Sequence, residues 1–286
     1  MALGPTPLGA FTALCPCVPM FFSTWETYHT HTLYLGYFNG PTEGLILATS
    51  IMLLSAIYGP QIWAAPLSQL FGNENLLGNT SVIDIWAPIL IISLLLAHIP
   101  DCVGNVIRAR RAKNLPIAPV FLEWTPMAIF TGSLMFWLGS PHSHLLKDNH
   151  LALLCLTLSF VFGRMTTKII LAHLTHQPFP YWTMLMAPLV GGALLVNLPS
   201  FGLPAVGSEV ELWYLRAYFV FATAAYSRWA VLVIDAICGY LGINCLTIPE
   251  EKWKVLQEMS LPKQEGTKIG TAALKVVKGG VDGKGA

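Results

Sequence analysis

One polar stretch, residues 25–44, concentrates titratable and aromatic side chains between two apolar segments. Glu26 and His29 lie three residues apart, and a carboxylate beside an imidazole can act in acid–base catalysis or as metal ligands. Glu43 follows in a Gly-Pro-Thr-Glu-Gly turn. No metal-binding spacing such as HExxH is present. We take Glu26, His29 and Glu43 as candidate cavity residues, with an aromatic belt at a membrane interface as the alternative.

A second group of chemically active side chains lies within an apolar segment. Arg164 and Lys168 are four residues apart and share a helix face, and His173 follows them. Charges inside a membrane span cost at least about 2.5–3.5 kcal/mol, so each calls for a partner or a purpose. Two cations on one face predict a site for substrate phosphate. Alternatively, both cations snorkel to the interface or pair with a carboxylate. The carboxylates considered for such pairs are Asp101, Glu123 and Asp235.

Asp101 and Asn105 form another pair with helical spacing, near the end of an apolar segment. Metal ligation or substrate contact is one interpretation of this pair. Hydrogen bonding between neighbouring helices is the favoured one, because polar side chains commonly join helices in membranes.

The composition identifies the elements that must position these residues. Hydrophobic residues make up 54% of the 286 residues and charged residues 11%, whereas soluble domains carry about 25% charged residues. Only helices or closed barrels span lipid, and no alternating strand pattern appears. We therefore predict an all-α, polytopic transmembrane helix bundle with about seven spans. The predicted spans are residues 8–24, 44–64, 86–107, 118–138, 150–174, 180–198 and 212–234.

Basic residues predict the orientation and the domain organisation. The first of them form a cluster at residues 108–113, between the third and fourth predicted spans, and the positive-inside rule places this loop in the cytosol. Counting spans from there puts residues 25–40 in the cytosol as well. We predict a bundle over residues 1–248 and a cytosolic, disordered tail over residues 249–286. The net charge of +1 gives no electrostatic basis for binding nucleic acid.

Two segments resemble a known family. The run STWETYHTHTLYLGYFNGPTEG at residues 23–44 is similar to a segment of fungal choline/ethanolamine phosphotransferases, which belong to the CDP-alcohol phosphotransferase class I family. FGRM at residues 162–165 and AHLT at residues 172–175 resemble a second segment of the same proteins. The resemblance extends to about residue 248.

The resemblance implies an enzyme of phospholipid biosynthesis. Such enzymes are integral to the endoplasmic reticulum or Golgi membrane and transfer phosphocholine or phosphoethanolamine from CDP-choline or CDP-ethanolamine to diacylglycerol. The products are phosphatidylcholine and phosphatidylethanolamine. The resemblance also implies a Mg²⁺ or Mn²⁺ cofactor, which neutralises the diphosphate, and a homodimer.

The family's catalytic signature, DGxxARx8GxxxDxxxD, does not occur in this sequence, whose five aspartates lie elsewhere. We therefore expect no metal ligand among these residues and interpret the chain as the C-terminal two-thirds of such an enzyme, inactive by itself. The alternative is a non-catalytic membrane partner or regulator of a complete phosphotransferase. A small-solute transporter is a third hypothesis, which the lack of an inverted repeat disfavours.

Overall fold

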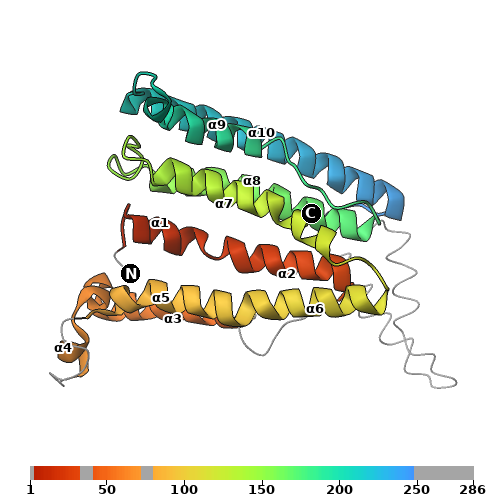
Figure 1. Cartoon of the computed structure of the whole chain (residues 1–286), viewed down its shortest axis with the longest axis horizontal. Coiled ribbons are helices and arrows are strands. Elements are labelled where there is room, and N and C mark those ends of the chain that lie inside the picture. Colours follow the sequence, from red (N-terminus) through yellow and green to blue (C-terminus); the bar gives the residue numbers. More distant parts are fainter. Residues whose placement is uncertain (1–2, 33–40, 72–79, 248–286) are drawn as a thin grey trace, which may run out of the picture. The chain divides into compact units, whose positions relative to one another are not determined.

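Helices make up every named element in the described part of the chain (Figure 1). The computed structural model describes residues 3–32, 41–71 and 80–247. Within these residues no strand forms, and Pro66 and Ser81 make an isolated antiparallel bridge. The predicted all-α class is therefore confirmed for the described residues.

The helical elements follow one another along the chain with short connections. They are α1 (Pro7–Leu14), α2 (Cys17–Thr30), α3 (Pro41–Tyr58), η1 (Pro60–Ala64), α4 (Leu67–Phe71), α5 (Val82–Ser93), η2 (Leu94–His98), α6 (Ile99–Ala112), η3 (Ala118–Trp124), α7 (Thr125–Leu138), α8 (Leu151–Leu174), α9 (Met186–Val196), η4 (Leu198–Phe201) and α10 (Ser208–Leu241). The chain divides into two compact units, Met1–Ser227 and Arg228–Ala286, and the sites described below lie in the first.

Among the described residues, four helical stretches are long and apolar enough to cross a membrane. They are Pro7–Thr30, Val82–Ala112, Leu151–Leu174 and Ser208–Leu241. Each coincides with one of the seven predicted spans. Shorter apolar helices, Ile46–Tyr58 and Met186–Val196, lie at two of the other predicted positions. The structure thus indicates an integral membrane protein, but the count of about seven spans is not confirmed.

Prolines account for the irregular points in two of these stretches. Pro16 separates α1 from α2 and caps the second helix without a side-chain hydrogen bond. Pro100 stands in the first turn of α6, directly after the π-helical turn η2. Because proline has no N–H and its ring crowds the preceding turn, it interrupts regular helical hydrogen bonding at both points.

The outer faces of several helices are apolar, as a membrane environment requires. Large hydrophobic side chains stay exposed on α3, including Met52 at 70% and Ile57 at 71%, and on η2, where Leu96 is 75% exposed. A soluble monomer rarely exposes contiguous apolar surface of this kind. These faces are suited to contact lipid chains.

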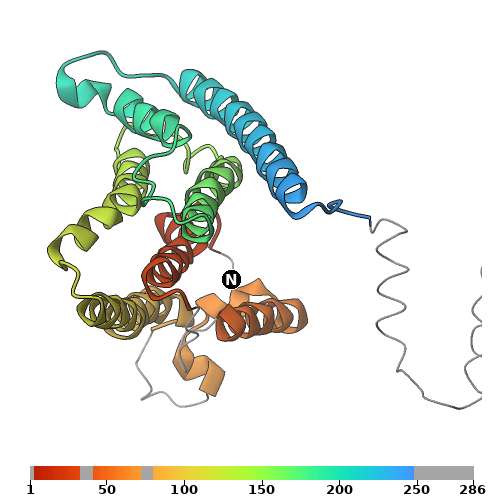
Figure 2. The same ribbon diagram turned by 90° about the vertical axis from the view of Figure 1, so that its right-hand side faces the viewer.

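The core forms where α2 packs against both α6 and α8 (Figures 1 and 2). The buried positions of α8 recur every three or four residues, which places them on one face of the helix. Among them Leu154, Val161 and Ile169 are fully buried. This packing brings the C-terminal end of α2 close to the C-terminal end of α8, where the polar side chains collect.

A second helix pair depends on a glycine. Helix α9 packs against α7, and the fully buried indole of Trp137 lies directly over Gly192. A Cβ at this position would overlap the indole ring. Small residues let membrane helices approach closely. Gly191 and Gly192 both lower the helix propensity of this segment, but the packing of the helix requires Gly192.

Replacing Gly192 by alanine should destabilise the chain by about 1–3 kcal/mol, because overpacking forces the indole or the helix to move. Gly132→Ala in α7 is the matched control, since an added Cβ there meets nothing within 4 Å. That control should be neutral or stabilising by up to about 1 kcal/mol, reflecting the helix propensity of alanine. Thermal unfolding of the detergent-purified chain measures both variants, and equal midpoints for Gly192→Ala and wild type would contradict the packing argument.

Candidate functional site

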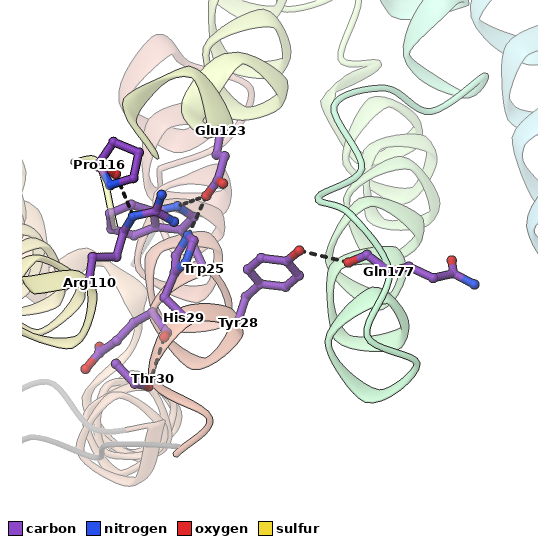
Figure 3. A network of polar contacts seen from close by, with 9 residues as sticks. Trp25, Tyr28, His29, Thr30, Arg110, Pro116, Glu123 and Gln177 are labelled. Carbon is purple, nitrogen blue, oxygen red and sulfur yellow. Dashed lines mark hydrogen bonds and ion pairs between the residues drawn. The ribbon is translucent and has the colours of Figure 1, made fainter. Parts of the chain in front are cut away.

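A buried carboxylate is the centre of the polar cluster at the C-terminal end of α2. Glu123, in η3, is 8% exposed, and its Oε2 accepts a hydrogen bond from Trp25 Nε1 at 2.8 Å. The same oxygen contacts Nε2 of His29 at 2.6 Å. Figure 3 shows both side chains reaching Glu123 from α2. Their spacing of four residues makes this possible, because it places the indole and the imidazole on one helix face.

Aromatic rings enclose this contact. The Trp25 ring meets the rings of His29 and Trp124 edge to face, with centroids 5.7 and 5.6 Å away. Tyr28 contacts His29 in the same manner at 5.1 Å, and its hydroxyl donates to the carbonyl of Gln177 at 2.8 Å. The imidazole is therefore held by packing as well as by its carboxylate. An imidazole that donates through Nε2 to a carboxylate has Nδ1 as its acceptor, the arrangement found in catalytic dyads.

Glu26 occupies a different side of α2. It is 3% exposed, and its Oε1 accepts a hydrogen bond of 2.7 Å from Asn105 Nδ2 in α6. Arg108 Nη1 in turn donates to the Asn105 side-chain oxygen at 3.3 Å. Glu26 and His29 thus have different partners, although their spacing suggested joint action. The favoured interpretation of Asn105, hydrogen bonding between helices, is confirmed.

The three candidate residues of α8 each contact a different part of the chain. His173 lies beside His31, and the two Nδ1 atoms are 3.3 Å apart. Lys168 Nζ donates to the carbonyl of Trp182 at 3.0 Å, and Arg164 Nη1 to that of Ala225 at 3.1 Å. Glu123, considered earlier as a partner of these cations, is bound instead by the indole and imidazole of α2.

Glu43 lies in the first turn of α3, and its side chain is outside the described residues. Its predicted role stays a prediction.

The described residues do not fit a Mg²⁺ or Mn²⁺ site. Among them, no three histidine, cysteine, aspartate or glutamate side chains come together in a way that could hold a metal ion. The carboxylates of Glu26 and Glu123 each take hydrogen bonds from protein donors instead. Hard divalent ions require several oxygen ligands, so we derive no catalytic step through a metal from these side chains.

Sequence analysis missed a second buried carboxylate of the same kind. Glu211 in α10 is 1% exposed and accepts hydrogen bonds from Trp137 Nε1, Ser143 Oγ and the backbone N–H of His144, at 2.9, 3.0 and 2.8 Å. One sequence signal could have revealed Glu211. It is an isolated glutamate at the end of one apolar segment, together with a tryptophan at the end of another. Each buried carboxylate needs such donors, because burial without them is costly.

The sequence of this chain is similar to those of several known proteins. No protein-family model matches the chain. Over 244 residues it is 32% identical to an uncharacterized CDP-alcohol phosphatidyltransferase class-I family protein of Schizosaccharomyces pombe, covering 81% of this chain and 58% of the relative. It is 31% identical over 245 residues to choline/ethanolaminephosphotransferase 1 of Arabidopsis thaliana, covering 82% of this chain and 61% of the relative.

A third relative is cholinephosphotransferase 1 of Saccharomyces cerevisiae, 32% identical over 191 residues that cover 62% of this chain and 46% of the relative. The homologues of this chain are thus members of the CDP-alcohol phosphatidyltransferase class-I family, including choline/ethanolaminephosphotransferases. The chain spans about three-fifths of the length of the first two relatives.

Removing the central carboxylate should destabilise the chain strongly. Glu123→Ala leaves the Trp25 indole and the His29 imidazole without their acceptor, and each unsatisfied buried group costs about 1–3 kcal/mol. The unfolding midpoint of the purified chain should therefore fall well below that of wild type. Glu123→Gln, which keeps an acceptor oxygen, should retain part of the stability.

Glu209→Ala is the control for this experiment, because Glu209 is exposed and lies two residues from the buried Glu211. If Glu123→Ala unfolds at the same midpoint as Glu209→Ala, the buried carboxylate does not hold this end of the bundle together.

Proposed function

We propose that this chain belongs to the CDP-alcohol phosphatidyltransferase class-I family and serves in phospholipid synthesis. The activity would be transfer of phosphocholine or phosphoethanolamine from CDP-choline or CDP-ethanolamine to diacylglycerol. The observation that carries the proposal is similarity to such proteins over 81–82% of the chain. The membrane-length helices support it, because diacylglycerol is dissolved in the bilayer.

In this proposal the polar end of the bundle, where α2 and α8 finish, is the cytosolic end. A soluble CDP-alcohol would reach it from the cytosol, and diacylglycerol would reach it from the membrane. The protein would lie in the endoplasmic reticulum or Golgi membrane as a homodimer, with its C-terminal tail in the cytosol. The basic residues Arg108, Arg111 and Lys113, which are exposed after the core of α6, agree with a cytosolic loop.

In this proposal His29 accepts the proton of the reaction. The hydroxyl oxygen of diacylglycerol forms a bond to the β-phosphorus while the bond from that phosphorus to the bridging oxygen breaks, and CMP leaves with the electron pair. The hydroxyl proton passes to Nδ1 of His29. Glu123 orients the ring through Nε2 and stabilises the imidazolium that forms, as carboxylates do in other dyads.

The other candidate residues are proposed as substrate contacts. Glu26 and Glu43 would line the cavity on the α2 and α3 side. Arg164, Lys168 and His173 would approach the phosphate groups from α8. Lysine carries three N–H donors, and the bond to the Trp182 carbonyl engages one of them.

Residues 1–286 by themselves are proposed to be inactive, because they lack the aspartate signature that holds the divalent metal in this family. The alternative, favoured by the same observation, is a non-catalytic membrane partner that assembles with a complete phosphotransferase and regulates it.

Expression from genomic DNA that includes the region upstream of the Met1 codon tests the proposal. Membranes from such cells should convert CDP-choline or CDP-ethanolamine and diacylglycerol to phospholipid, whereas residues 1–286 alone should not. If the genomic product is equally inactive but purifies together with a complete phosphotransferase, the regulatory alternative replaces the enzymatic one.

In the active product, His29→Gln should lower kcat by at least about 100-fold, the usual contribution of a general base. His150→Gln, in the connection between α7 and α8, is the matched control and should keep kcat within about twofold of wild type. The kcat of both variants is measured with saturating CDP-alcohol. A His29→Gln variant with unchanged kcat assigns the proton transfer to another residue.

A further inference from the structure

Two histidines that are 142 residues apart in sequence meet at the polar end of the bundle. Nδ1 of His31 and Nδ1 of His173 are 3.3 Å apart. Their rings lie nearly parallel, with 26° between the planes and centroids 4.9 Å apart. Both nitrogens therefore lie at one edge of the ring pair.

This separation fits a tetrahedral metal ion. Zinc binds imidazole nitrogen at about 2.0–2.1 Å with tetrahedral angles, so two imidazole ligands of one ion lie about 3.3–3.4 Å apart. The observed 3.3 Å falls in this range. A neutral N–H···N hydrogen bond would also bring the two nitrogens to such a distance, and the experiment below separates the two interpretations.

The helices hold both ligands in place. His31 is the C-cap of α2, in the left-handed conformation with φ of 58°, and its backbone N–H donates to the carbonyl of Thr27. His173 lies in the last turn of α8. The Tyr28 ring contacts His173 at 6.4 Å between centroids, and the Tyr28 hydroxyl bonds the connection that follows α8. Because α2 and α8 pack together in the core, little reorganisation is needed to present the two nitrogens.

We propose that His31 and His173 chelate a borderline transition-metal ion of the Zn²⁺ class through their Nδ1 atoms. Imidazole nitrogen suits zinc, copper and nickel, whereas magnesium and calcium prefer oxygen ligands. Its nitrogen ligands therefore distinguish this ion from the Mg²⁺ or Mn²⁺ of phosphotransfer, although His173 is also proposed above as a phosphate contact. Bound metal would fasten the end of α2 to the end of α8.

The surroundings set the strength of this site. Lys113 lies near enough to His31 to act on it electrostatically. Lys113 also repels a divalent cation. With two protein ligands, the remaining coordination positions are open to water or to a ligand oxygen, so binding is reversible.

Zinc binding to detergent-purified residues 1–286 tests the proposal, measured by competition with a chromophoric zinc indicator at pH 7. We expect one Zn²⁺ per chain at this site. His31→Gln and His173→Gln should each weaken binding by at least about tenfold, since even outer-shell changes cost 10–100-fold in metal affinity. Excess Mg²⁺ should not displace the zinc. Lys113→Gln should tighten binding, because it removes the opposing charge.

Three further variants test whether the loss of zinc binding is specific to His31 and His173. His176→Gln in the same region and His142→Gln at the other end of α7 should bind zinc like wild type. His31→Cys supplies a thiolate, which is also a zinc ligand, and should restore binding that His31→Gln loses. This rescue distinguishes ligand loss from misfolding.

Two results would overturn the proposal. In one, wild type does not bind zinc. In the other, wild type and both glutamine variants bind it equally, which leaves the ring contact as a hydrogen bond. Neither result bears on the phosphotransfer assay, which is performed with the genomic product and without added zinc.

Discussion

A carboxylate buried in a membrane protein must receive hydrogen bonds from the protein itself, because the surroundings supply little water and burial of an unpaired charge is very costly. Glu123 and Glu211 meet this requirement in the same way, each with an indole N–H as one donor. They hold opposite ends of one stretch of chain. Glu123 precedes α7 and binds α2, whereas Glu211 binds Trp137 near the end of α7. Helix α7 is thereby tied to α2 and to the start of α10.

The same bonds that hold the bundle together also prepare the candidate site. His29 is oriented by Glu123 and enclosed by Trp25 and Tyr28. Another side of the same helix is fixed through Glu26 and Asn105. A group that accepts a proton must be positioned within fractions of an ångström, and rigid helices with satisfied polar contacts do this better than loops. Structure and proposed chemistry therefore depend on the same buried carboxylate.

Some features of the fold could be read from the sequence. The low charge and long apolar segments predicted a helical membrane protein, and the described residues are helical, with four stretches long and apolar enough to cross a membrane. The number of spans was less accessible, because apolar length alone does not tell how far a helix continues past a proline or glycine. Gly192 illustrates this limit. In sequence it weakens a helix, and in the structure it makes room for Trp137.

The sequence by itself determined the helical class, the membrane character and the polar residues that need partners, since these follow from composition and from spacing within one helix. Only the tertiary structure decided which partners they have. His29 was expected to act with Glu26, three residues away, but it binds Glu123, 94 residues away. His173 was grouped with the cations of its own helix, but it lies against His31, 142 residues away. Helical periodicity specifies which side chains share a face, whereas the helix that covers this face depends on packing across the whole bundle, and no local pattern encodes that choice.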